Sequence, residues 1–307
     1  MKNPKILVFG SINADLVFPV ESLPTKGETV LGANYFFHPG GKGANQAVAA
    51  AKAGGNVAFI GCVGKDGYSE VLIDSLKRAN VDTSLIKRGD TPTGCAAIGV
   101  DSSGENQIIV ASGANLEVLA SQVPDHLVNS STIVVLQMEV HPSENWSLIQ
   151  RAKAQSATII LNVAPASQVP MDVLSKIDFL VTNEHEINFL SKGLGIQDTN
   201  PIEAAQKISQ LTKNTCILTL GARGAFAFNQ SETLKIPALE LNPVDTTAAG
   251  DCFVGWLAAR LSEGDNLNQS MRWASIAAGK TCLVSGAQTS LPSFDTVKQT
   301  FLELHPQ

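Results

Sequence analysis

Residues 245–255, DTTAAGDCFVG, place small residues and two carboxylates just before a predicted helix. The apolar residues that define this helix by their 3.6-residue spacing are Phe253, Trp256, Leu257 and Leu261. Asp251 therefore lies in the predicted first turn. A helix N-terminus presents unpaired backbone N–H groups and the positive end of the helix dipole, and the small residues 248–250 leave room for an anion. The stretch predicts a site for a phosphate or an oxyanion.

Asp251 is a candidate catalytic base within this stretch. A carboxylate is unsuited to binding an anion, but it can accept the proton of a hydroxyl that attacks that anion. The helix N-terminus also predicts a low pKa for Asp251, so that it would orient the hydroxyl and accept its proton late. The alternative is that Asp251 only caps the helix, and residues 245–255 alone favour neither interpretation.

A second loop-to-helix junction is predicted at residues 38–54. The string HPGGKGANQA, residues 38–47, precedes an alanine-rich segment of high helix propensity. It matches neither the Walker A loop nor the GxGxxG dinucleotide fingerprint, and Lys42 and Asn45 make it more specific than a lone glycine pair. Two such junctions in one chain indicate a shared ligand.

The first apolar run, residues 6–9, is followed by GSINAD at residues 10–15. This pattern predicts a buried strand that presents Asn13 and Asp15 at its carboxyl end, where open α/β sheets bind their ligands. The two side chains alternate with apolar residues and so share one face if the strand continues. They could bind neighbouring hydroxyls of a polyol. An Asx-type turn is the alternative.

The alternation of strands and helices predicts an α/β fold, a Rossmann-like, mostly parallel sheet flanked by helices. Predicted strands lie at 6–9, 57–63, 132–138, 158–163, 179–182 and 216–220, and predicted helices at 69–79, 144–154, 184–190 and 202–211. We expect one domain over residues 1–307.

Two β-rich excursions interrupt this pattern. Residues 16–37 contain β-prone runs separated by Pro and Gly, and residues 93–110 read as a hairpin around a polar turn. Together they predict a small β-sheet lid from about 14–40 and 92–112, which would exclude water from a reaction. Its apolar residues are a candidate homodimer surface, with core packing as the alternative. These residues are Val17, Tyr35 and Phe37.

Three polar features directly follow predicted strands. They are Glu139, the pair Asn183 and Glu186, and the segment 221–224 that contains Arg223. The spacing of Asn183 and Glu186 is also that of a capping box. The segment 221–224 could be an ordinary tight turn with a solvated arginine.

Composition excludes several classes of protein. The chain has 307 residues, 44% of them hydrophobic, and a net charge of −6 without a Lys/Arg cluster, which argues against a nucleic-acid partner. Without an apolar run of about 18 residues or a signal h-region, we expect no membrane association and a cytoplasmic protein. The five scattered cysteines and five histidines lack the spacing of disulfide frameworks or transition-metal sites.

Taken together, these motifs resemble the ribokinase family of carbohydrate kinases. GSINAD, GGKGANQA, Asn183-x-x-Glu186, TLGARG at 219–224 and DTTAAGD occur in the family's order and at about its spacing, from Lys5 to Pro292. The resemblance implies ATP-dependent phosphorylation of D-ribose at O5, with Mg²⁺ accompanying ATP, K⁺ as an activating cation and a homodimer formed through the lid. The alternative is a family member that acts on another small sugar or a nucleoside, although a nucleoside would need an apolar shelf for its base.

The resemblance also implies a role for each matching residue. Asp251 would be the base, and the backbone of Ala248, Ala249 and Gly250 would form the anion hole with it. The residues implied to bind the sugar are Asn13, Asp15, Gly41, Lys42, Asn45, Glu139 and Asp251. Those implied at the nucleotide are Asn183, Thr219, Gly221, Ala222, Arg223, Gly224, Gly250 and Ser275, with Glu186 holding Mg²⁺ through water. The implied K⁺ site comprises the backbone around Asp245, Thr247, Thr281, Val284 and Gly286 and the side chain of Ser290. Ala248 departs from the glycine that many relatives carry there.

Overall fold

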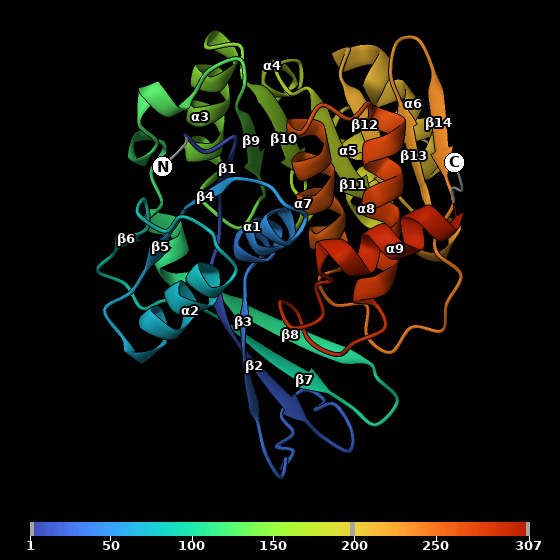
Figure 1. Ribbon diagram of the computed structural model, residues 1–307. Coiled ribbons are helices and arrows are strands. Elements are labelled where there is room, and N and C mark those ends of the chain that lie inside the picture. Colours follow the sequence, from blue (N-terminus) through green and yellow to red (C-terminus); the bar gives the residue numbers. More distant parts are fainter. Residues whose placement is uncertain (1–2, 197–199, 305–307) are drawn as a thin grey trace.

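The computed structural model describes residues 3–196 and 200–304 (Figure 1). Its larger sheet has the strand order β14-β13-β12-β11-β10-β9-β1-β4. The strands are β1 Ile6–Phe9, β4 Val57–Ile60, β9 Ile133–Leu136, β10 Thr158–Asn162, β11 Phe179–Asn183, β12 Thr215–Thr219, β13 Ala225–Phe228 and β14 Thr233–Ile236. All pairs from β12 to β4 are parallel, whereas β13 and β14 add antiparallel pairs. The predicted Rossmann-like sheet is confirmed.

Helices cover both faces of this sheet. On one face lie α1 Lys42–Lys52, α2 Gly67–Arg78, α7 Ala249–Ser262, α8 Leu267–Thr281 and α9 Phe294–Leu304; on the other lie α3 Pro142–Ala154, α4 Met171–Leu174, α5 Glu184–Gly193 and α6 Pro201–Thr212. Side chains alternate along each strand, so Val8 packs with the α1 side and Phe9 with the α3 side. Burial on both faces explains why these strands are apolar throughout.

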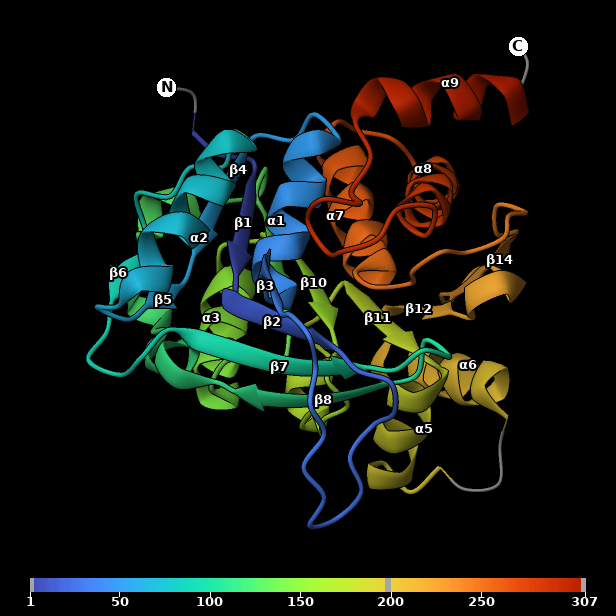
Figure 2. The ribbon, with the colours of Figure 1, turned by 90° about the horizontal axis from the view of Figure 1, so that it is seen from below.

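A second, smaller sheet has the order β3-β2-β7-β8. Its strands are β2 Asn13–Pro19, β3 Phe36–Gly40, β7 Gly94–Val100 and β8 Asn106–Ala111. It projects from the end of the α/β body at which β1 ends, as the two ribbon views show (Figures 1 and 2). The predicted β-prone segment and the predicted hairpin are therefore paired with each other, through β2 and β7.

Two expectations about these strands need correction. The run 57–63 is divided into β4 and β5 (Cys62–Val63), and β5 pairs with β6 (Lys87–Arg88) outside the larger sheet.

The second correction concerns the apolar residues of the predicted lid surface. Phe37 is half-buried because its ring stacks on Tyr68 of α2 with centroids 5.6 Å apart, and Val17 is also only half-exposed. Tyr35 is 63% exposed. Core packing therefore describes Phe37 better than a free lid surface does.

Short 3₁₀ turns η1 Gly113–Glu117, η2 Ala120–Gln122, η3 Asp125–Leu127 and η4 Gly221–Arg223 complete the described elements. Across the described ranges, no helix has both the length and the apolar character needed to cross a bilayer.

Candidate active site

Glycines bring the first junction into contact with the end of β1. A Cβ at Gly43 would lie 2.7 Å from the backbone nitrogen of Ser11, and one at Gly41, where φ is +90°, would lie 2.8 Å from that of Asn13. A Cβ at Gly40 would lie 1.9 Å from Oδ2 of Asp15. The glycines of the 38–47 motif therefore let the start of α1 pack on the β1–β2 connection and leave room for the Asp15 carboxylate.

The second junction confirms the predicted position of Asp251 in the first turn of α7. The N-cap residue is Ala248, in a left-handed conformation with φ +60°, and no side chain caps the helix. The Asp251 carboxylate is buried and accepts two hydrogen bonds from α1 instead. Nδ2 of Asn45 donates to Oδ2 and Nε2 of Gln46 donates to Oδ1, each over 3.0 Å. Asp251 is thus held between two helices and is not a helix cap.

The backbone before Asp251 is open to a ligand. The first turn of a helix leaves its N–H groups without i−4 acceptors, and of those near Asp251 the N–H of Ala249 donates to the carbonyl of Thr246 over 3.3 Å. A Cβ at Gly250 would meet no heavy atom within 4 Å, so a ligand atom can approach this turn closely. This geometry suits a transferring phosphoryl group better than a bulky apolar ligand.

The predicted low pKa of Asp251 is wrong. Burial raises its pKa, and the nearby charge of Glu139 raises it further, against the opposing effects of Lys42, Asn45 and Gln46. The helix N-terminus does not prevent this, because the carboxylate exchanges water for only two amide donors and one nearby ammonium group.

Asp15 shares this environment. Burial raises its pKa to about 7, and the charges of Glu139 and Asp251 contribute in the same direction, with Lys42 opposing. For Lys42 itself, burial lowers the pKa, but the surrounding carboxylates, Asp251 foremost, outweigh burial and raise it. The site therefore holds one partly buried ammonium group among several carboxylates, and such a set offers both donors and acceptors to hydroxyl groups.

The neighbouring strand end adds Glu139. Its Oε2 accepts hydrogen bonds from Oγ of Ser11 over 2.5 Å and from the backbone nitrogen of Lys42 over 3.0 Å. Glu139 thus fixes the start of α1, and its negative charge also repels the carboxylates of Asp15 and Asp251. Asn115, which the sequence reasoning missed, positions Asn13 by donating to its Oδ1 over 2.7 Å. No motif marks Asn115, because η1 reaches the site only through the tertiary fold.

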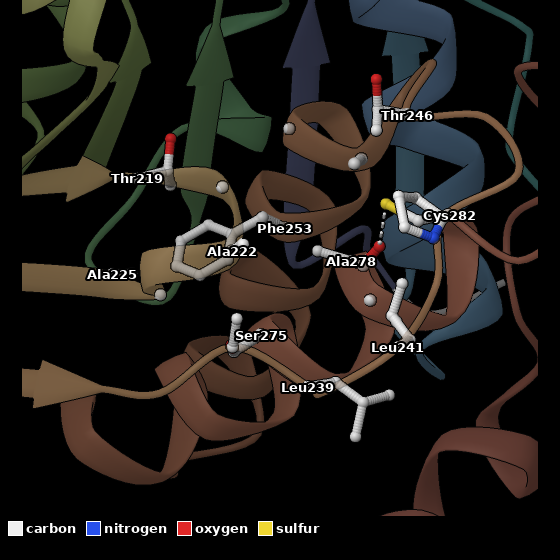
Figure 3. Close-up of a pocket in the computed structure, with 17 residues that line it drawn as sticks. Thr219, Ala222, Ala225, Leu239, Leu241, Thr246, Phe253, Ser275, Ala278 and Cys282 are labelled. Carbon is white, nitrogen blue, oxygen red and sulfur yellow. Dashed lines mark hydrogen bonds between the residues drawn. The ribbon is translucent and has the colours of Figure 1, made fainter.

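A cavity of about 250 Å³ lies beside the start of α7 (Figure 3). Six of the predicted nucleotide-binding residues line it, namely Thr219, Gly221, Ala222, Gly224, Gly250 and Ser275. Phe253 of α7 and Leu239 and Leu241 of the preceding segment form much of its wall, and the sequence reasoning missed all three. An apolar cavity with a few polar groups suits a flat heteroaromatic ring.

Two predicted nucleotide residues do not line this cavity. Arg223 instead forms an ion pair with Glu184, and both side chains are about half-exposed. Asn183 forms the predicted capping box of α5: its Oδ1 accepts from the backbone nitrogen of Glu186 over 2.9 Å, and Oε2 of Glu186 accepts from that of Asn183 over 2.8 Å. Burial raises the pKa of Glu186, and the negative charge of Asp251 raises it further. The hydrogen bond from the backbone of Asn183 and the positive charge of Lys42 oppose this rise.

The Glu186 carboxylate is the group that fits a metal ion here. Among residues 3–196 and 200–304 no three His, Cys, Asp or Glu side chains form a metal-binding group. Mg²⁺ that arrives with a nucleotide keeps several waters and needs only one or two protein carboxylates, so a single fixed acidic side chain matches it.

The residues predicted around K⁺ come from the loop before α7 and from the last residue of α8 with the loop that follows it, and a hydrogen bond from Gly286 to Asp245 joins these segments. Oδ1 of Asp245 accepts from the backbone nitrogen of Thr247 over 2.9 Å, and Oδ2 accepts from that of Gly286 over 2.8 Å. Burial alone would raise the pKa of Asp245, but these hydrogen bonds lower it. Ser290 donates to the carbonyl of Ala287 over 2.8 Å. The backbone carbonyls of these loops can serve as ligands for a hard monovalent cation.

Residues 3–293 match the profile described as pfkB family carbohydrate kinase. The chain is 36% identical over 304 residues to a ribokinase of Lactococcus lactis subsp. lactis (strain IL1403), covering 98% of each sequence. A crystal structure of ribokinase from Thermotoga maritima superposes with a TM-score of 0.91 at 35% identity, covering 98% of this chain and 99% of that one. The structure of Arabidopsis thaliana ribokinase complexed with ribose and ATP superposes with a TM-score of 0.86 at 30% identity, covering 96% and 98%.

Proposed function

The chain belongs to the pfkB family of carbohydrate kinases, and we propose that it transfers the γ-phosphoryl group of ATP to O5 of D-ribose. One observation carries the proposal. The buried Asp251 carboxylate, held by Asn45 and Gln46, lies at the open first turn of α7, between the polar group around Asp15 and Lys42 and the apolar cavity. The similarity to ribokinases over nearly the whole chain supports ribose as the sugar.

In the proposed reaction each residue has a distinct task. The sugar hydroxyls are held by six residues, namely Asn13, Asp15, Gly41, Lys42, Asn45 and Glu139. O5 forms a bond to the γ-phosphorus, the bond from that phosphorus to the β,γ-bridging oxygen breaks, and the proton of O5 passes to Asp251. The backbone N–H groups of residues 248–251 stabilise the charge on the transferring group. The burial that raises the pKa of Asp251 makes it a better proton acceptor than an exposed aspartate.

The nucleotide takes the cavity beside α7. Adenine lies against Phe253 and Leu239 near Ser275, and its phosphates extend along Thr219, Gly221, Ala222 and Gly224 toward Gly250, with Asn183 and Arg223 at the outer side. Glu186 holds Mg²⁺ through water, and the ion supplies neutralisation of the phosphate charge. K⁺ would be held by the backbone carbonyls of residues 245, 247, 281, 284 and 286 and by the side chain of Ser290, and its positive charge would fix the segments beside the anion hole.

The smaller sheet acts as a lid, residues 14–40 and 92–112, on a single kinase domain of residues 1–307. Two lids pair in a homodimer, which their exposed apolar residues support. These are Phe18, Leu31, Tyr35, Phe36, Ile108, Ile109 and Val110. A cytoplasmic location is supported by the five cysteines, all of which lie in described segments as free thiols.

The decisive experiment measures ADP release from MgATP with D-ribose, 2-deoxyribose, D-fructose, adenosine or pseudouridine, in K⁺ and in Na⁺, with Asp251→Asn alongside. We expect turnover with D-ribose that needs K⁺ and falls by orders of magnitude in the variant at nearly unchanged sugar affinity. Stronger turnover with another compound would replace ribose by that sugar or nucleoside and keep the mechanism. Near-normal turnover of Asp251→Asn would overturn the assignment of the base. Equal rates in K⁺ and in Na⁺ would overturn the proposed activation by K⁺.

A further inference from the structure

Next to Asp251 lies a set of buried amides to which neither a motif nor a similarity assigns a role. Gln46 and Gln137 have no exposed surface, and Asn162 is 7% exposed. Nε2 of Gln137 donates to Oε1 of Gln46 over 2.7 Å, and Nε2 of Gln46 donates to Asp251 and to Oδ1 of Asn162, over 3.0 and 3.1 Å. The amides thus connect β9 and β10 to the candidate base.

The direction of each hydrogen bond in this set follows from one backbone carbonyl. Nδ2 of Asn162 donates to the carbonyl oxygen of Val181 over 3.2 Å, and a carbonyl can only accept. The Oδ1 atom of Asn162 must therefore face Gln46, which obliges Gln46 to present Nε2 to both Asn162 and Asp251. Its Oε1 then faces Gln137 and needs a donor there. A rotated Gln46 amide would place an oxygen against two other acceptors.

Gln137 has a fixed place because Gly10 leaves room for it. A Cβ at residue 10 would lie 1.8 Å from Oε1 of Gln137. That Oε1 atom is buried and has no hydrogen-bond partner among the described residues. A buried amide oxygen without a hydrogen-bond partner lowers the stability of the folded state. The same orientation of the Gln137 amide directs its Nε2 donor at Gln46. The arrangement is one that stability alone would not favour.

We propose that Gln46 and Gln137 are positioning residues for the phosphoryl transfer, forming an amide relay that holds the Asp251 carboxylate in the orientation that accepts the proton of the sugar hydroxyl. The inference rests on the proposed role of Asp251 as the base. Asn45 fixes Oδ2 and Gln46 fixes Oδ1, so loss of either donor frees the carboxylate to rotate. The donor from Gln46 also opposes the rise in the pKa of Asp251 that burial causes.

The test compares kcat as a function of pH, at saturating MgATP and sugar, for Gln46→Met and Gln137→Met. Both changes keep the volume and remove the amide. In Gln46→Met we expect the acidic limb of kcat to move up by about one pH unit, with kcat about tenfold lower on that limb, recovery toward alkaline pH and a sugar KM within about twofold of the parent. Gln137→Met should shift the limb in the same direction by less, because it loosens Gln46 without removing it.

Gln122→Met is the matched control. Gln122 is a buried glutamine whose Nε2 donates to the carbonyls of Gly61 and Leu85, outside the relay. It should lose stability in thermal unfolding but keep the parental pH profile. Gly10→Ala is a second probe that displaces Gln137 and keeps its side-chain amide, and its Cβ would also lie 3.1 Å from Cα of Gly43. It should shift the limb as Gln137→Met does.

The outcomes separate this inference from the proposed function. An unshifted profile in folded Gln137→Met and Gly10→Ala, or a changed sugar KM at constant kcat, would overturn the relay while an inactive Asp251→Asn still supported the base. An active Asp251→Asn would overturn the base itself and the relay with it.

Discussion

Gly255 of α7 lies so close to Gln46 of α1 that a Cβ on residue 255 would stand 2.5 Å from the carbonyl oxygen of Gln46. Gly255 follows Asp251 by four residues and so lies on the same face of α7. This close approach of the two helices brings Asn45 and Gln46 within 3.0 Å of the Asp251 carboxylate. The packing of two backbones therefore determines the surroundings of the candidate base.

Gly255→Ala should destabilise the protein and lower kcat together. The added methyl group would meet backbone atoms that cannot rotate away, and overpacking of this kind costs about 1–3 kcal/mol in the free energy of unfolding. Chemical denaturation and kcat measurements test this prediction. Gly67→Ala is the control, because a Cβ at that helical glycine would have no heavy atom within 4 Å. A Gly255→Ala variant as stable as Gly67→Ala would show that α1 and α7 have room to adjust.

The sugar KM should rise as the pH falls through about 7. Asp15 has a pKa raised from 3.8 to about 7, and its protonated form loses acceptor capacity toward the sugar hydroxyls. Below that pKa we expect KM to increase by about tenfold per pH unit, with a smaller change in kcat. Steady-state kinetics between pH 5.5 and pH 8.5 measure this directly. In Asp15→Asn, KM should be high and nearly independent of pH; a parental KM that is constant over the range contradicts the assignment.

The same group should affect the stability of the sugar-free protein. Between 3.8 and about 7 the folded state binds a proton at Asp15 that the unfolded state has released. Stability therefore decreases as the pH rises through this window. Asp15→Asn removes the effect, so its Tm relative to the parent should increase from pH 5 to pH 8. A difference in Tm that does not change with pH would indicate that Asp15 is charged throughout.

Asp245→Asn should raise the K⁺ concentration needed for half-maximal activity. Both carboxylate oxygens accept backbone hydrogen bonds, from Thr247 and Gly286, and an amide can accept only at its single oxygen. We expect about a tenfold increase, since a hydrogen bond to a charged group contributes about 1.5–3 kcal/mol. Rates are measured against KCl at constant ionic strength, with Asp74→Asn as an exposed control on α2. If Asp245→Asn kept the K⁺ dependence of the parent, the proposal that these loops bind the cation would be wrong.

Ile109→Lys should convert a homodimer into a monomer without unfolding it. Ile109 is 75% exposed on β8, which is an edge strand of the smaller sheet and offers both apolar side chains and unpaired backbone groups. Sedimentation velocity measures the change, and Leu211→Lys, on the exposed surface of α6, is the control. A parental protein that sediments as a monomer, or an Ile109→Lys variant that remains a dimer, would contradict pairing through the lid.

Local patterns in the sequence determined much of this protein. Apolar periodicity located the strands from β9 to β12 and the helices α3, α5 and α6, and the apolar spacing from Phe253 onward placed Asp251 in the first turn of α7, because helix starts and buried strands depend on neighbours within a few residues. The capping box of Asn183 and Glu186 followed from a spacing of three. Short elements without a clear period, such as β13 and β14, did not.

Only the tertiary structure decided what surrounds those residues. Gln46 reaches Asp251 across 205 positions of sequence, Asn115 supports Asn13 across 102, and the stacking of Phe37 on Tyr68 removes it from the lid surface. The pKa of Asp251 had the opposite direction to the prediction for the same reason. A helix N-terminus is a local feature, whereas the removal of water depends on every segment that packs around the carboxylate.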